Sequence, residues 1–160
     1  MNNNIIDINI NGIQRKRYRI NGDDSKILEL NPTDFNITVR MNEAYPKLTE
    51  CESRIAELSE VTKEFNKESE NESSPEDMTK FSEKLSELNS TMCELIDYIF
   101  DSNVSELCCD GGSMYDLIDG YMRYEIIIDN LVKLYENNLS AEAKKIQRRV
   151  KKHTAKYTQK

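Results

Sequence analysis

Two runs of apolar residues, spaced three or four positions apart, constrain the fold of this chain more than any other feature. The first run covers residues 37–65 and the second covers residues 78–99. This spacing places the apolar side chains of each run on one face of a helix. The segment between them, residues 66–76, is acidic, rich in Ser and Asn and without an apolar residue, which indicates a loop. We therefore predict an antiparallel helical hairpin with helices over residues 32–65 and 76–100.

The first predicted helix has a recognisable start and one interruption. Asn31 can cap it, Pro32 suits its first position, and Asp34 complements the positive end of the helix dipole. Pro46 lies inside the apolar run, where a proline kinks or breaks a helix. Because the apolar spacing keeps its phase across Pro46, we expect a kink.

Residues 4–30 are expected to form a small antiparallel β-meander of three strands. In residues 6–10 isoleucine alternates with polar residues, and residues 13–20 form a second run that ends in isoleucine. Each run is followed by an Asn-Gly pair. Such a pair is the strongest short hairpin signal. A third run follows over residues 26–30. A sheet of this size is marginal in water, so one face should lie on helices or on another subunit.

The rest of the chain is also expected to be helical. A short helix is predicted over residues 104–109, and a long helix over residues 113–138 carries an apolar face too broad for a single partner helix. The predicted fold class is mainly α, with a small N-terminal antiparallel β-meander, a helical hairpin and a long C-terminal helix. The expected domains are the meander over residues 4–30, a helical domain over residues 32–139 and a basic tail over residues 140–160.

The net charge of −7 is distributed unevenly. From Lys144 onward the chain has eight Lys or Arg residues and no Asp or Glu, which leaves the first 143 residues at −15. Such a body repels nucleic acid and anionic membranes over most of its surface. The tail itself has three interpretations, which stay open: a solubilising terminal helix, a contact for an acidic protein, or a contact for nucleic acid.

Two cysteines and one histidine are the first candidates for catalysis. His153 is the only histidine, and it lies among lysines with no acidic residue near it in the sequence to position it as a base. Cys108 and Cys109 precede a Gly-Gly loop, where a helix start could favour a thiolate. The simpler interpretation is that one of the two packs in the core and the other faces a neighbouring helix.

Acidic pairs are the candidates for a metal site. Asp23 and Asp24 lie in an expected turn without the ligand spacing of a calcium loop. Asp97 and Asp101 lie four positions apart near a helix end, where a solvated face explains them. We therefore expect no enzyme activity, no cofactor and no metal.

The four cysteines form no Cys-x-x-Cys pair, and the sequence begins without a basic or apolar leader. The longest apolar run is only residues 126–128, far short of a membrane span. We expect a cytoplasmic protein with reduced thiols and no membrane partner.

We predict that the protein acts by binding another protein, with nucleic acid disfavoured and a homo-oligomer left open. The first apolar run and the basic tail supply the expected contacts. These contacts are Ile37, Met41, Tyr45, Leu48, Ile55, Leu58, Phe65, Arg148, Arg149, Lys151 and Lys152.

The order of the features resembles a known family. A meander with Asn-Gly turns is followed by the helix start Asn31-Pro-Thr-Asp34 and a charged helical hairpin. Residues 95–102 then read Leu-Ile-Asp-Tyr-Ile-Phe-Asp-Ser, and the last helix closes with Ala-Lys-Lys-Ile-Gln-Arg-Arg-Val-Lys-Lys over residues 143–152. Together these features are similar to the small tail assembly chaperone-like proteins of phages of Gram-positive bacteria. The resemblance implies a non-enzymatic protein that binds the tail tape measure protein and recruits tail tube subunits.

A second hypothesis is a phage-encoded inhibitor of a host defence enzyme, acting through an acidic helical surface that mimics nucleic acid. It depends on acidic residues expected on the outer face of the hairpin. These are Glu50, Glu52, Glu57, Glu60, Glu64 and Glu68. A third hypothesis, nucleic-acid binding by the tail, predicts salt-dependent binding that is lost when residues 144–160 are deleted.

Overall fold

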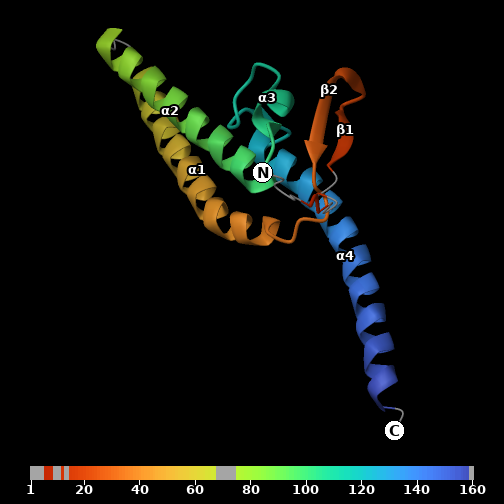
Figure 1. Cartoon of the computed structure of the whole chain (residues 1–160). Coiled ribbons are helices and arrows are strands. Elements are labelled where there is room, and N and C mark those ends of the chain that lie inside the picture. The colour runs from red at the N-terminus through yellow and green to blue at the C-terminus, as the bar shows by residue number, and fades with distance from the viewer. Residues whose placement is uncertain (1–5, 9–11, 13–14, 68–74, 159–160) are drawn as a thin grey trace, which may run out of the picture.

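The computed structural model describes residues 6–8, 12, 15–67 and 75–158, and in this part of the chain it is mainly helical (Figure 1). The predicted fold class is confirmed: a small N-terminal antiparallel sheet precedes a helical hairpin and a long C-terminal helix. The elements in order are β1 (Lys16–Ile20), β2 (Asp23–Leu30), α1 (Ile37–Lys67), α2 (Pro75–Phe100), α3 (Val104–Cys109), β3 (Leu117–Ile118), β4 (Tyr121–Met122) and α4 (Arg123–Thr158).

Among the described residues the N-terminal sheet has two strands, β1 and β2, where a three-stranded meander was predicted. Asn21 and Gly22 join the strands with φ of 51° and 74°, as the hairpin signal predicts. Residues 6–8 are not in a strand, and residues 9–11 of the expected first strand lie outside the described residues. Leu28 and Leu30 of β2 are fully buried, so this sheet gains its stability by packing one face on the helices.

Helix α1 begins at Ile37, five residues after the predicted start at Pro32. Side chains hold the intervening residues in turns. The Asn31 Oδ1 atom accepts a hydrogen bond of 3.0 Å from the Thr33 hydroxyl, and the Asp34 Oδ1 atom accepts one of 2.9 Å from the Asn36 backbone amide. Asn and Asp compete with helical hydrogen bonding in this way.

The prediction of a continuous first helix is confirmed, because α1 runs through Pro46 without a break. Figure 1 shows α1 changing direction in its first, orange part before it runs beside α2. A proline inside a helix removes one backbone hydrogen bond and crowds the preceding turn, so a bend there is expected.

Helices α1 and α2 lie side by side and form the predicted antiparallel hairpin (Figure 1). The first half of α1 and the second half of α2 join the core, in which Leu48 of α1 and Met92 and Ile96 of α2 are fully buried. Helix α3 covers residues 104–109, as predicted. The far end of the hairpin extends beyond the other elements as a pair of helices.

The long helix α4 begins at Arg123, so the predicted start at residue 113 is wrong. The preceding residues form the short antiparallel strands β3 and β4, joined by Asp119 and Gly120 with φ of 52° and 85°. The Asn89 side chain accepts a 2.8 Å hydrogen bond from the Met114 backbone amide and so holds the start of this segment on α2.

Helix α4 continues to Thr158, so the predicted helix end at residue 138 is wrong, and residues 140–158 of the expected tail belong to the same helix. Its first half joins the core through residues such as Tyr124 and Tyr135, and the ring centroids of Tyr135 and Phe100 are 5.9 Å apart. Its second half projects away from the body toward the C-terminus (Figure 1). The Asn138 side chain donates to the Leu134 carbonyl at 2.7 Å, which an uninterrupted helix accommodates.

Candidate functional site

Much of the apolar run expected to contact a partner faces the protein's own core. Ile37, Leu48 and Ile55 are buried, and Met41 and Leu58 pack partly buried against the same core. Tyr45 is exposed. The side chain of Phe65 lies outside the described part of the structure. The run therefore holds the hairpin to the body, and contacts for a partner have to come from other faces of the same helices.

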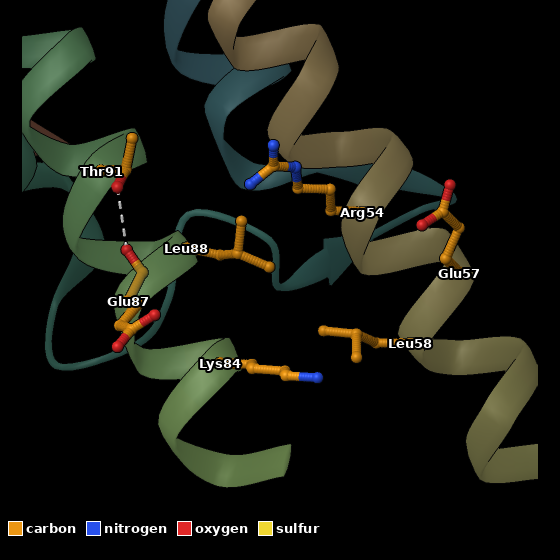
Figure 2. Close-up of a pocket in the computed structure, with 7 residues that line it drawn as sticks. All are labelled: Arg54, Glu57, Leu58, Lys84, Glu87, Leu88 and Thr91. Atoms are coloured by element: carbon orange, nitrogen blue, oxygen red, sulfur yellow. Dashed lines mark hydrogen bonds between the residues drawn. The ribbon is translucent and has the colours of Figure 1, made fainter. Parts of the chain in front are cut away.

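One such face carries a hollow between α1 and α2, shown in Figure 2. Its volume is about 560 Å³. It is lined by Arg54, Glu57 and Leu58 of α1 and by Lys84, Glu87, Leu88 and Thr91 of α2. Leu58 and Leu88 point toward each other across the space between the helices and form an apolar floor.

A second hollow, of about 620 Å³, continues the first toward the body. The two hollows share Thr91, and the lining residues of each helix recur at three-, four- or seven-residue steps, which places them on one face of the hairpin. The second hollow is lined by Glu43, Ala44, Lys47, Thr91, Glu94, Leu95 and Tyr98. We call the two together the hairpin groove.

The walls of the hairpin groove carry charges of both signs. The carboxylates are Glu43, Glu57, Glu87 and Glu94, and the cations are Lys47, Arg54 and Lys84. At one end the Tyr98 hydroxyl donates a hydrogen bond to the Glu43 carboxylate and so ties α2 to α1. This hydrogen bond raises the pKa of Tyr98. An apolar floor between walls of mixed charge suits an amphipathic peptide better than an anionic polymer.

The groove offers little to a catalytic mechanism. Its described lining contains no cysteine and no histidine. The Thr91 hydroxyl donates a 3.0 Å hydrogen bond to the Glu87 backbone carbonyl rather than to a base (Figure 2). A hydroxyl nucleophile needs a neighbouring general base to activate it.

The cysteines are packed as the simpler interpretation predicts. Cys109 is buried in the core, and Cys108 is partly buried beside it. Burial raises the pKa of Cys109 to about 12 and also raises the pKa of Cys108. Both side chains are therefore protonated thiols at neutral pH, which makes them poor nucleophiles.

The acidic pairs have structural roles. The Asp97 carboxylate accepts 2.7 Å hydrogen bonds from the backbone amide and the hydroxyl of Ser105, so it caps α3 rather than lying on a solvated face. Asp101 forms a 2.8 Å ion pair with Arg15, and Asp23 accepts a hydrogen bond from the Ser25 hydroxyl. Among the described residues, no group of three or more His, Cys, Asp or Glu is placed to hold a metal ion.

The acidic side chains of α1 that the structure describes do not form an isolated negative face, and Glu64 and Glu68 lie outside the described side chains. Glu50 pairs with Arg54 at 2.6 Å, and Glu52 accepts a hydrogen bond from the buried Tyr124. Glu57 lies in the wall of the hairpin groove beside Arg54. The surface needed for mimicry of nucleic acid is therefore interrupted by cations and by internal contacts.

The basic residues of the expected tail lie on the projecting half of α4. Arg148, Arg149, Lys151 and Lys152 are all exposed, as is His153. We call residues 144–158 the basic arm. Two exposed apolar side chains, Ile146 and Val150, also lie on it. Sequence reasoning missed these two, although their four-residue spacing within a helical segment is a signal for a shared face.

Comparison with protein-family models, with curated proteins and with solved structures finds no match to this chain. Within the described ranges, no helix combines the length and the apolarity needed to cross a membrane.

Proposed function

We propose that the protein is a non-enzymatic binding protein that holds an amphipathic helix of a partner protein in the hairpin groove. The observation that carries this proposal is the groove itself, with the Leu58 and Leu88 side chains on its floor and charged residues along both walls. A helix bound in a groove places apolar residues spaced by three, four and seven positions toward the floor. Its polar flanks then meet the charged walls.

The charge pattern of the groove supports a protein partner over nucleic acid. Glu87 and Glu94 lie along one wall, and Glu43 and Glu57 along the other. A phosphate backbone would be repelled at each of these carboxylates, whereas a peptide helix can supply Lys or Arg opposite them.

The resemblance of the sequence to tail assembly chaperone-like proteins supports a narrower proposal. In it the bound helix belongs to a phage tape measure protein, and the protein recruits tail tube subunits in the host cytoplasm. A long helical partner fits a groove that runs along two antiparallel helices, since each segment of the partner offers the same apolar stripe. This narrower proposal depends on the resemblance, and the general one depends on the groove.

Co-purification tests both proposals. The full chain is co-expressed with the tape measure protein of the same phage, and the captured amount is compared with that of a groove variant carrying Glu87→Lys and Glu94→Lys. Both glutamates are exposed, so the variant should fold. We expect capture by the native chain and at least about a tenfold loss of affinity in the variant, which corresponds to about 1.4 kcal/mol.

The matched control reverses two exposed glutamates outside the groove, Glu83 and Glu136, to lysine, so the net charge changes equally. Capture that survives in the groove variant would show that the groove is not the binding site. An absence of capture by the native chain would reject the tape measure protein as the partner. Equal losses in the groove variant and the control would assign the effect to overall charge.

A further inference from the structure

The strand pair β3–β4 exposes an unusual concentration of apolar surface. Leu117 is 71% exposed, Ile118 39% and Tyr121 61%, and all three lie within five residues of the chain. The pair is only two residues long in each strand, and its tip is the Asp119–Gly120 turn. We call residues 117–122 the strand hairpin. Ile118 pairs with Tyr121 across the two strands, so these two side chains share one face of the strand hairpin, and Leu117 lies on the opposite face. Exposed apolar side chains that share a face are typical of an interaction site.

The basic arm carries another pair of exposed apolar side chains. Ile146 is 41% exposed and Val150 56%. They lie one helical turn apart, so they share a face of α4. The arm extends beyond the body, where an isolated helix rich in like charges gains little stability by itself. A surface that covers Ile146 and Val150 would stabilise it.

The strand hairpin lies in an acidic part of the chain, whereas the arm is basic. Residues 101–122 contain five Asp or Glu and no Lys or Arg, whereas residues 144–158 contain seven Lys or Arg and no Asp or Glu. Three of the five acidic residues already pair within the described body: Asp101 with Arg15, Asp110 with Lys26 and Asp116 with Arg123. Glu106 and Asp119 are exposed, and Asp119 lies at the tip of the strand hairpin beside the exposed apolar side chains.

We propose that the basic arm of one copy of this chain docks on the strand hairpin of a second copy. Ile146 and Val150 of the first copy cover Ile118 and Tyr121 of the second, which share a face, and arginines and lysines of the arm lie near Asp119. Charge complementarity selects this occupant, because an acidic body repels nucleic acid and anionic membranes but attracts the arm of another copy. The contact is separate from the hairpin groove.

The positions of the two surfaces, one before α4 and one on its second half, make the contact reciprocal. The strand hairpin directly precedes α4, and the basic arm ends it. A helix of 36 residues is about 54 Å long. Two copies that lie antiparallel along α4 therefore place each arm at the strand hairpin of the other copy. This arrangement has two-fold symmetry and closes as a dimer with two identical contacts.

Light scattering of the full chain over a concentration series tests the dimer. At low salt we expect a mass of twice 18.6 kDa. In about 1 M salt the screening length falls to about 3 Å, so the dimer should be weaker. Its dissociation constant should therefore be higher than at low salt. A monomer at every concentration at low salt overturns the proposal.

Two variants locate the contact. The arm variant carries Ile146→Ser and Val150→Ser, and the hairpin variant carries Ile118→Ser and Tyr121→Ser, which lie on one face of the strand hairpin. All four side chains are exposed, so the substitutions leave the core intact. Each variant alone should dimerise at least about tenfold more weakly than the native chain. The control replaces two other exposed apolar residues, Val39 and Met78, with serine and should keep the native mass.

Mixing the two variants is the decisive measurement. A mixed dimer joins the intact arm of the hairpin variant to the intact strand hairpin of the arm variant, which restores one of the two contacts. We expect the mixture to form more dimer than either variant alone. If the mixture does not recover, or if neither variant weakens the dimer, the arm does not dock on the strand hairpin. Loss of the dimer with retained partner capture would separate this result from a failure of the groove.

Discussion

The hydroxyl of Tyr124, a residue that is only 1% exposed, donates a hydrogen bond to the carboxylate of Glu52 on α1. This contact joins the start of α4 to the middle of the helical hairpin across 72 positions of sequence. Burial and the hydrogen bond to Glu52 both raise the pKa of Tyr124, so the phenol stays protonated and keeps its role as the donor. The rest of its ring fills the core between these elements.

Replacing Tyr124 with phenylalanine should lower the free energy of unfolding by about 1 kcal/mol, because the hydrogen bond is lost while Glu52 can still reach water. Tyr124→Ala should cost about 3–5 kcal/mol, because it also leaves a cavity. Urea unfolding followed by circular dichroism measures both values. Tyr121→Phe, which removes an exposed hydroxyl, is the control and should leave the stability unchanged. A Tyr124→Phe variant as stable as the native chain would contradict the stabilising role of this hydrogen bond.

Asp34 should make the stability depend on acid pH. Burial by itself raises the pKa of this carboxyl, but hydrogen bonds from Arg40 and from the Asn36 amide, with the Arg40 charge, outweigh burial and lower it. A lowered pKa in the folded state stabilises the protein above the unfolded-state pKa of about 3.9, and this contribution is lost as pH falls through the folded value. The Arg40–Asp34 pair is 2.8 Å long and mostly shielded from solvent.

We therefore expect Asp34→Asn to lower the free energy of unfolding by about 1 kcal/mol at pH 7 and by less at about pH 3. Urea unfolding of the native chain and the variant across this range gives the difference directly. Asp24→Asn is a suitable comparison, because the Asp24–Arg19 pair is largely exposed and contributes little. A difference that stays constant with pH would mean that the Asp34 charge does not stabilise the fold.

The thiol of Cys109 should be unreactive in the folded protein. Burial raises its pKa to about 12, which leaves almost no thiolate at neutral pH. At pH 7 a thiol-specific reagent should label Cys109 only after urea unfolds the chain. Mass spectrometry of labelled peptides identifies the site, and the unfolded chain, in which all four cysteines are accessible, is the control. Rapid labelling of Cys109 in the native protein would show that this part of the core opens readily.

The sequence predicts the elements whose spacing is regular and whose signals are local. Residue patterns over short stretches of sequence predict the apolar runs of α1 and α2, the Asn21–Gly22 turn and the bounds of α3. The start of α1 does not, because the Asn31 and Asp34 side chains can either cap a helix or hold a turn. The tertiary fold, and not the local sequence, decides whether these side chains cap a helix or hold a turn.

The strand hairpin and the length of α4 show a different limit. Leu117 and Ile118 fit the apolar spacing of a helix, and this fit concealed the Asp119–Gly120 turn signal. Gly120 has a φ of 85°, which a helix does not contain. Farther on, Asn137 and Asn138 resemble a helix end, but a single helix tolerates them when its neighbouring turns are already formed. The hairpin groove was not predicted, since its walls are formed by charged residues whose spacing gives no apolar signal.

The uninterrupted course of α4 gives the chain a mechanical property. One helix joins the packed core at Tyr135 to the basic arm. The arm therefore has a fixed rotational orientation about the helix axis relative to the body, which a flexible tail would not have. Each residue added or removed between Tyr135 and Ile146 would turn the arm by about 100° and shift it by about 1.5 Å along the axis. The number of residues in this stretch therefore sets the direction that Ile146 and Val150 face.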